Sequence, residues 1–216
     1  MRISRPHLVA CLVACVIASV SNASPRNWNL LPEVLHSDDH LTPSHNQVLV
    51  SGLTLGQHRI AFERTRWSDL QRHLGPLRIR RQGDASEAED WTCFTVVTDQ
   101  GQVQIWPHGG ELQGGKYIAG VIAQAGTPWP RTECPVVNAG PGGPALDNGV
   151  WIGTAKAKLL RRLGKPTASL GAALIYDFEV ALRDPKAGEC STFGRLIFEI
   201  RAGRVDRLDV QKNSAC

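Results

Sequence analysis

One short segment of this sequence occurs twice, and the duplication constrains the fold more than any other feature. Residues 65–75 align without gaps on residues 154–164, and both segments have Thr, Leu, Arg, Leu and Gly at equivalent positions. In each segment the Thr predicts a helix N-cap and the final Gly predicts the C-terminal cap. Apolar residues recur between them at helical spacing. The chain is therefore expected to contain two short helices, each with an apolar stripe that another element must cover.

Runs typical of β-strands follow each predicted helix. They cover residues 91–97, 103–106 and 117–123 after the first helix, and residues 172–180, 195–200 and 205–210 after the second. Ala202 and Gly203 predict a tight hairpin turn between the last two runs. An antiparallel sheet with one apolar face would cover both helical stripes. The expected fold class is α+β, with two related units, each a short helix or helical hairpin followed by an antiparallel β-meander.

Composition shifts divide the chain further. Residues 24–46 are polar and unperiodic and predict a flexible N-terminal arm, whereas residues 47–55 and 58–62 read as additional strands. Residues 138–149 are too rich in Gly and Pro for a helix or a central strand, so we expect a linker there. These boundaries predict a first unit over residues 47–137 and a second unit over residues 150–216.

The first residues have the layout of a cleavable secretion signal. Arg2 and Arg5 precede an apolar run at residues 8–20, which small or polar residues follow, so residues 1–23 are expected to be removed. The apolar run is shorter than the ~20 residues of a membrane-spanning helix. A lipoprotein-type box ends at Cys15 and leaves a lipid anchor there as the alternative. We expect a periplasmic or secreted protein.

Four cysteines remain after the predicted cleavage, and an exported protein is expected to pair them. In the predicted hairpin, the register that puts Ile200 opposite Val205 brings Cys190 opposite Cys216 to within one residue. Cys93 and Cys134 then pair by elimination. Each predicted disulfide falls within one unit.

No residue pattern predicts catalysis or a cofactor. The segment 36–40 with His45 has metal-ligand residue types, but it lies in the polar arm and reads as solvated, so no metal site is predicted. Residues 108–110 look faintly like an oxyanion loop, yet the chain has no G-x-S-x-G nucleophile motif, which favours a glycine-rich hairpin loop. Glu87, Glu89 and Asp90 read as a solvated acidic loop.

Aromatic residues beside Gly- and Pro-rich segments give the best candidate for a binding surface. These are Trp106, Tyr117, Trp129 and Trp151, with Arg66 and Arg131 as possible polar neighbours. Tryptophan and tyrosine are favoured anchors in protein interfaces. The alternative interpretation is that the rings fill the core. The net charge is only +4 and the one basic cluster, residues 78–81, is short, so no nucleic-acid partner is expected.

Residues 153–166 and 194–210 combine a helix, Leu-Gly-Lys-Pro and a strand hairpin that turns at Gly-Arg-Val. This unit resembles the SmpA/OmlA superfamily of small outer-membrane lipoproteins, and its tandem arrangement resembles β-lactamase inhibitory proteins. The first copy departs from the pattern, because its helix ends in Gly75-Pro76 and residues 126–149 form a Gly- and Pro-rich insertion. The resemblance rests on caps and turns, so it implies a fold and transfers no binding residue.

The sequence leads to a functional hypothesis with two rivals. We expect a bacterial exported, non-enzymatic module, inhibitor-like or assembly-like, that binds another envelope or extracellular protein through concave sheet faces and tryptophan-bearing loops. An envelope hydrolase whose site forms only on folding is one alternative. An outer-membrane structural lipoprotein is the other.

Overall fold

The fold is mostly antiparallel β-sheet with two short helices. The computed structural model describes residues 50–84, 88–110, 115–126, 129–184 and 188–215, together with Pro32. The helices, α1 (Trp67–Leu74) and α2 (Lys156–Leu163), have eight residues each, so the predicted class α+β fits only loosely. Neither is long and apolar enough to cross a membrane, and no other described segment forms such a helix.

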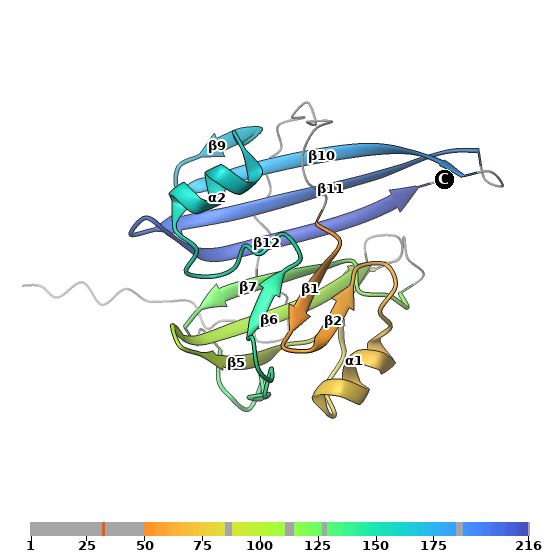
Figure 1. The fold of residues 1–216 in the computed structure, drawn as a ribbon. Helices are drawn as coiled ribbons and strands as arrows, with labels where there is room; N and C mark the ends of the chain where they lie inside the picture. Colours follow the sequence, from red (N-terminus) through yellow and green to blue (C-terminus); the bar gives the residue numbers. More distant parts are fainter. Residues whose placement is uncertain are drawn as a thin grey trace, which may run out of the picture.

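One large sheet runs through the whole molecule (Figure 1). Its nine strands are β3 (Arg80–Gln82), β4 (Glu89–Trp91), β5 (Phe94–Thr98), β6 (Gly101–Gly110), β7 (Gly120–Ala125), β9 (Ala168–Leu170), β10 (Ala173–Asp184), β11 (Gly188–Arg201) and β12 (Arg204–Ala215). The order is β3-β4-β6-β7-β12-β11-β10-β9, and β5 pairs with β6 beyond the end of β4. Pairing of β7 with β12, with Val121 opposite Val210, joins the two predicted units into a continuous sheet.

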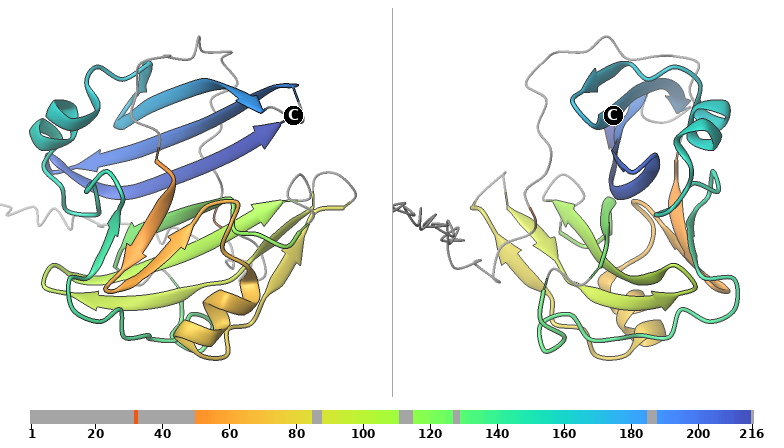
Figure 2. Two further views of the ribbon diagram at one scale, coloured as in Figure 1. Left: turned by 45° about the vertical axis from the view of Figure 1, so that its right-hand side comes forward. Right: turned by 90° about the vertical axis from the view of Figure 1, so that its left-hand side faces the viewer.

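A second sheet of three strands lies against one side of the large sheet (Figure 2). Its order is β2 (His58–Ala61), β1 (Gly52–Leu55) and β8 (Pro144–Leu146). Strand β8 lies inside the predicted linker 138–149, so part of that segment is an edge strand paired with β1 rather than a connection alone. Proline is tolerated there because it stands at the first residue of an edge strand.

Both helices lie where the duplicated segment predicts them, but their N-terminal caps differ from the prediction. Thr65 and Thr154 each precede the true N-cap, which is Arg66 in α1 and Ala155 in α2. Each threonine hydroxyl instead accepts a hydrogen bond from a backbone N–H three or four residues earlier. The hydroxyl therefore fixes the turn that leads into the helix, because threonine side chains also stabilise such local turns.

The apolar stripes of the helices enter one hydrophobic core. Trp67 and Leu70 of α1, and Leu159 and Leu163 of α2, are buried there against the inner face of the large sheet and the small sheet. Full burial of a large apolar side chain contributes about 1.5–3 kcal/mol. The helices, too short to be stable alone, are held by this packing.

The turn prediction is confirmed, whereas the strand predictions missed the short strands. Ala202 and Gly203 connect β11 to β12, both with positive φ, as a two-residue hairpin turn requires. The predicted run 91–97 is divided between β4 and β5 around Thr92 and Cys93. Strands β3 and β9 escaped prediction because each has only three residues and little hydrophobic alternation.

The disulfide between Cys93 and Cys134 is present, as predicted. Cys190 is also disulfide-bonded, but its predicted partner, Cys216, lies outside the described residues. The register of β11 and β12 reaches Ser191 opposite Ala215 and includes a bulge next to Ile200, which accounts for the one-residue offset in the prediction. The predicted signal 1–23, Cys15 and most of the arm 24–46 lie outside the described residues as well.

Candidate binding site

Two of the candidate rings lie inside the first half of the molecule, on the outer face of the large sheet. Trp106 and Trp129 pack with Trp91 and the Cys93–Cys134 disulfide in a separate buried cluster. Trp129 meets each of the other two indoles edge-on, with ring centroids 5.5 and 5.6 Å apart. These rings cover the sheet and the disulfide, so little indole surface is left to contact a partner protein.

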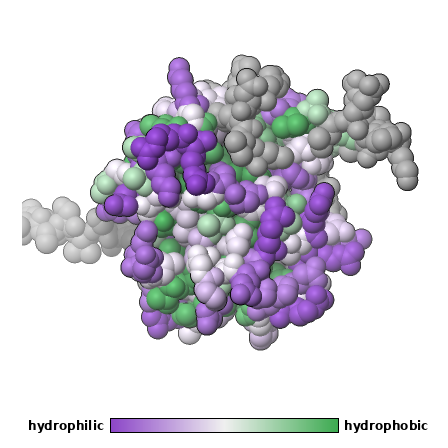
Figure 3. Space-filling model, in the orientation of Figure 1, coloured by the Kyte–Doolittle hydropathy of each residue, from purple (hydrophilic) through white to green (hydrophobic). Residues whose placement is uncertain are grey.

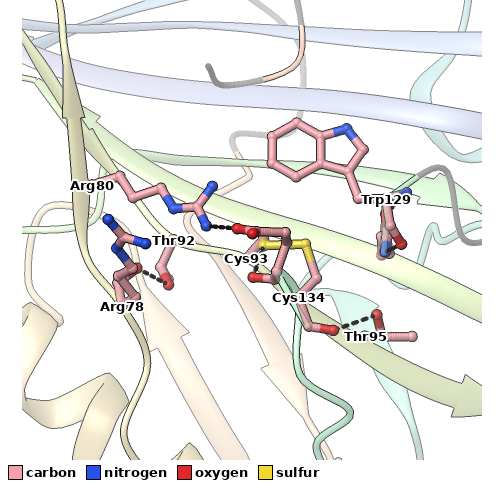
Figure 4. The surroundings of a disulfide bond; sticks show 9 residues. Arg78, Arg80, Thr92, Cys93, Thr95, Trp129 and Cys134 are labelled. Atoms are coloured by element: carbon pink, nitrogen blue, oxygen red, sulfur yellow. Dashed lines mark hydrogen bonds and ion pairs between the residues drawn. A yellow bond between two sulfur atoms is a disulfide. The ribbon is translucent and has the colours of Figure 1, made fainter. Parts of the chain in front are cut away.

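Polar contacts hold this cluster in place (Figure 4). The Gln104 side chain binds both backbone groups of Trp129, donating to its carbonyl at 2.8 Å and accepting from its N–H at 3.0 Å. The Arg80 guanidinium lies 5.0 Å from the Trp91 ring centroid and forms an ion pair with Glu133. Such contacts fasten the Trp129 segment to the sheet as an added layer.

The other candidates lie elsewhere, so the structure does not bring the predicted residues into one patch. Tyr117 is half-buried before β7, pairs with Arg66 through a β-bridge and lies 5.7 Å below its guanidinium. Arg131 is exposed after Trp129. Trp151 is 8% exposed in the main core, and its ring also lines a large cavity.

That cavity is part of a groove where the first and second halves of the sheet meet. Two neighbouring cavities of about 380 and 550 Å³ share five lining residues, which are Gln100, Val103, Ile152, Gly153 and Arg204. Together they form the seam groove, whose walls are the β5–β6 turn, the segment 151–155 before α2, and the β11–β12 turn. Ligand pockets in proteins have volumes of this order.

Gln100 and Gly153 set the shape of the seam groove. Gly153 has φ +82°, and a Cβ at this position would lie 1.5 Å from the Gln100 side-chain oxygen. Only glycine leaves room for that amide and adopts the backbone angle without strain. The Gly153 carbonyl accepts from the Arg204 guanidinium at 2.8 Å and its N–H donates to the Val205 carbonyl at 2.7 Å. The floor of the groove at Gly153 is thus held by two hydrogen bonds to its backbone.

Charged side chains surround the groove unevenly. Lys158 and Arg204 line the smaller cavity, together with Asp99. Arg201 and Asp206 add one charge of each sign on the larger cavity, which also includes Arg204. The five groups leave a net positive charge.

The Trp151 side chain adds a buried donor to this wall. Its indole Nε1–H has no hydrogen-bond partner among the residues that the structure describes. A buried donor without a partner costs about 1–3 kcal/mol.

A second polar feature, the pair of His108 and Glu89, lies on the outer face of the sheet. His108 Nδ1–H donates to Glu89 at 2.5 Å, and the ring is almost fully buried. Burial opposes protonation, but the hydrogen bond to Glu89 and the charges of Glu89 and Asp209 raise the pKa of His108 above its usual value. Within the described residues, neither seam-groove cavity includes His108.

Two sequence interpretations of this region were wrong. Residues 108–110 end strand β6 and do not form a hairpin loop. Glycine is required at position 109, because a Cβ there would lie 2.1 Å from the Tyr117 carbonyl oxygen. Glu89 and Asp90 belong to β4 rather than to a solvated loop, since they bind His108 and Arg81. Glu87 lies outside the described residues.

The sequence did not single out Gln100, Gly153, Lys158 or Arg204 as site residues. One signal was available: the duplicated helices differ at their third residue, Asp69 in α1 and Lys158 in α2. The predicted metal-type residues 36–40 and His45 lie outside the described part of the chain, in which no three possible metal ligands cluster.

No protein family matches this chain, and neither a curated protein nor a solved structure was found to be similar to it.

Proposed function

We propose that this chain is an exported, non-enzymatic protein-binding module that holds a segment of another envelope or extracellular protein in the seam groove. The observation that carries the proposal is the groove itself, which combines a preformed cavity, a floor hydrogen-bonded at Gly153 and a net positive rim. The partner would contact this groove and the adjoining sheet edge instead of the tryptophan-bearing loops. The tryptophans support the fold from inside, as their burial indicates.

The proposal includes an origin for the groove in two related units. Helix α2 follows α1 at an offset of 89 residues at both ends. The N-cap Arg66 corresponds to Ala155, and the C-cap Gly75 corresponds to Gly164. The residues next to the helices repeat their contacts as well. The Thr65 carbonyl accepts from Ile118 N–H at 3.0 Å, and the Thr154 carbonyl accepts from Val205 N–H at 2.9 Å.

The strand order supports the same idea. On one side the sheet has the order β3-β4-β6-β7, with β5 as an additional strand beside β6, and on the other side it has the order β9-β10-β11-β12. Strands β7 and β12, the last of each set, pair in the middle of the sheet. Duplication with end-to-end pairing would produce this order directly. It would also place the seam, and the groove along it, between two copies of one ancestral surface.

Site-specific photo-crosslinking tests the function. A benzophenone amino acid at Asp99, an exposed residue on the rim of the groove, would be compared with the same group at Gln57, an exposed residue in the β1–β2 turn that lines neither cavity. Each oxidised protein would be irradiated in an envelope extract of the source organism, and adducts would be identified by mass spectrometry.

We expect one defined protein adduct at position 99 that is absent at position 57. Equal adducts at both positions would indicate nonspecific contact. No adduct at position 99, with the protein folded as judged by circular dichroism, would contradict the proposal.

A further inference from the structure

We propose that the N-terminal arm packs on the outer face of the second half of the large sheet, where its segment 28–35 covers Ile175 and Ile197. The arm would then be a layer of the fold instead of the flexible extension expected from the sequence. The inference is independent of the proposed function, because neither cavity of the seam groove includes these two isoleucines.

One row of side chains crosses the outer face of the sheet from the first half to the second. The strand register places its members side by side, in the order Trp106, Ile122, Asp209, Ile197, Ile175 and Ala168. Residues next to them in the strands, such as Val210 and Phe198, belong to the main core on the inner face. Because successive side chains of a strand point to opposite faces, the whole row lies on the side away from that core.

The isoleucines of this row are buried as deeply as core residues. Ile197 is 1% exposed and Ile175 is 2% exposed. The ion pair of Arg195 with Asp177 lies beside them on the same strands. Side chains stand roughly perpendicular to a sheet, so such neighbours shield the flanks of an isoleucine but not its outer end. A further layer must therefore lie over the row.

In the described chain, no helix or strand supplies this layer for the second half. Helix α2 and the small sheet lie on the inner side of β10, β11 and β12 (Figure 2). The Trp129 segment belongs to the cluster at the other end of the row, with Trp106 and Ile122. The cluster that contains Ile175 and Ile197 consists of strand residues alone. Its side chains also contrast with the strongly hydrophilic surface over α2 (Figure 3).

The lengths of the segments outside the described residues point to the arm. Four internal ones have at most four residues each and lie between described segments, namely residues 85–87, 111–114, 127–128 and 185–187. Residues 33–49 can span about 55 Å when extended. They lead to Val50, which is buried in the main core. This length is sufficient to pass around an edge of the sheet and reach its outer face, because neighbouring strands are only about 5 Å apart.

The arm also has the side chains that such a layer needs. Five of the eight residues in segment 28–35 are apolar, namely Trp28, Leu30, Leu31, Val34 and Leu35. Their burial against Ile175 and Ile197 is favourable because it removes apolar surface from water. Pro32 lies within this segment, and the structure describes it as half-buried. A segment extended into water would leave that proline exposed.

The test is photo-crosslinking within the full chain, exported and oxidised. A benzophenone amino acid replaces Trp28, and the same group at the exposed Gln57 is the control. The purified protein is irradiated at low concentration, monomeric and dimeric products are separated, and crosslinked peptides are identified by mass spectrometry. Ile197→Asp is combined with the group at position 28 and compared with Val97→Asp, which changes an exposed valine of β5.

We expect a monomeric adduct between position 28 and peptides of β10, β11 or β12, which the group at position 57 does not form. Ile197→Asp should lower the yield of this adduct about tenfold, because it would bury a carboxylate among apolar side chains, and Val97→Asp should leave the yield within about twofold. If Ile197→Asp does not fold, the position of the adduct in the parent protein decides alone.

Three results would overturn the inference. A crosslinked dimer as the main product would mean that a second copy covers this face. Monomeric adducts only with other parts of the chain, or none, would place the arm elsewhere. An equal yield in folded Ile197→Asp would show that the arm does not depend on the isoleucine row.

Discussion

Each half of the molecule contains one short helix and antiparallel strands of the large sheet, and the outer face of that sheet differs between the two halves. In the first half, from α1 to β7, the outer face of the sheet is covered by three tryptophans and the Cys93–Cys134 disulfide. In the second half, from α2 to β12, the same face has ion pairs, such as Arg195 with Asp177 at 2.6 Å. One face of a continuous sheet is therefore covered by aromatic rings in one half and has ion pairs in the other.

The helix termini show the same contrast on a smaller scale. Asp69 occupies the third position of α1, and Lys158 occupies it in α2. The Asp69 carboxylate accepts from the Arg66 N–H, whereas Lys158 lines the smaller cavity of the seam groove. Corresponding positions of the two helices thus carry opposite charges, and the first turn of α2 has no acidic residue.

Removal of the Cys93–Cys134 disulfide should have the largest effect on stability, and it tests how the first half of the molecule is stabilised. The double change Cys93→Ser and Cys134→Ser opens a loop with a sequence separation of 41. On the chain-entropy account, it should lower the free energy of unfolding by about 4 kcal/mol. Urea denaturation of both proteins at one pH measures the loss. A loss below about 1 kcal/mol would mean that the tryptophan cluster alone fixes this layer.

Equivalent leucines in the helices test whether the halves depend equally on their cores. Leu70 and Leu159 stand at corresponding positions and are 2% and 0% exposed. Leu70→Ala and Leu159→Ala should each cost roughly 2–5 kcal/mol, because each leaves a cavity in the shared core. Thermal and urea unfolding provide the comparison, with Leu170→Ala, at an exposed site, as the control. If only one of the two changes destabilises the protein, the helices do not have equivalent roles.

The His108–Glu89 pair gives the first half a pH dependence that should be separable by mutation. Because the folded-state pKa of His108 is raised, protonation stabilises the fold. This contribution is fully present below about pH 6.5, the value for an unfolded chain, and is lost as the pH rises through the folded-state pKa. His108→Gln should reduce the fall in unfolding free energy measured across that range. An unchanged pH profile would show that His108 stays neutral in the fold.

The sequence predicted those parts of the fold that depend on local chemistry. The helices end at Gly75 and Gly164 as expected, and the turn at Ala202 and Gly203 follows from its residue types. The Cys93–Cys134 disulfide also followed, since the hairpin register left it as the remaining pair. These features are determined within a few residues or by one strand pairing.

The parts that escaped prediction depend on distant contacts. Two hydrogen bonds between the Trp129 backbone and the Gln104 side chain of β6 hold Trp129 against the sheet, and no local pattern reports such a partner. The seam groove needs the β7–β12 pairing, which brings Gln100 beside Gly153. The one local clue was the exchange of Asp69 for Lys158 between the duplicated helices, and its meaning depends on what lies opposite.

The smallest expected effect on stability comes from making the two helix termini alike. Asp69→Ala should cost about 0.5–1 kcal/mol, because α1 loses its carboxylate, whereas Lys158→Asp should stabilise α2 by about 0.3–1 kcal/mol. Urea denaturation of both variants measures the two effects. Unchanged stability in Lys158→Asp would show that the N-terminus of α2 gains nothing from a carboxylate at this position.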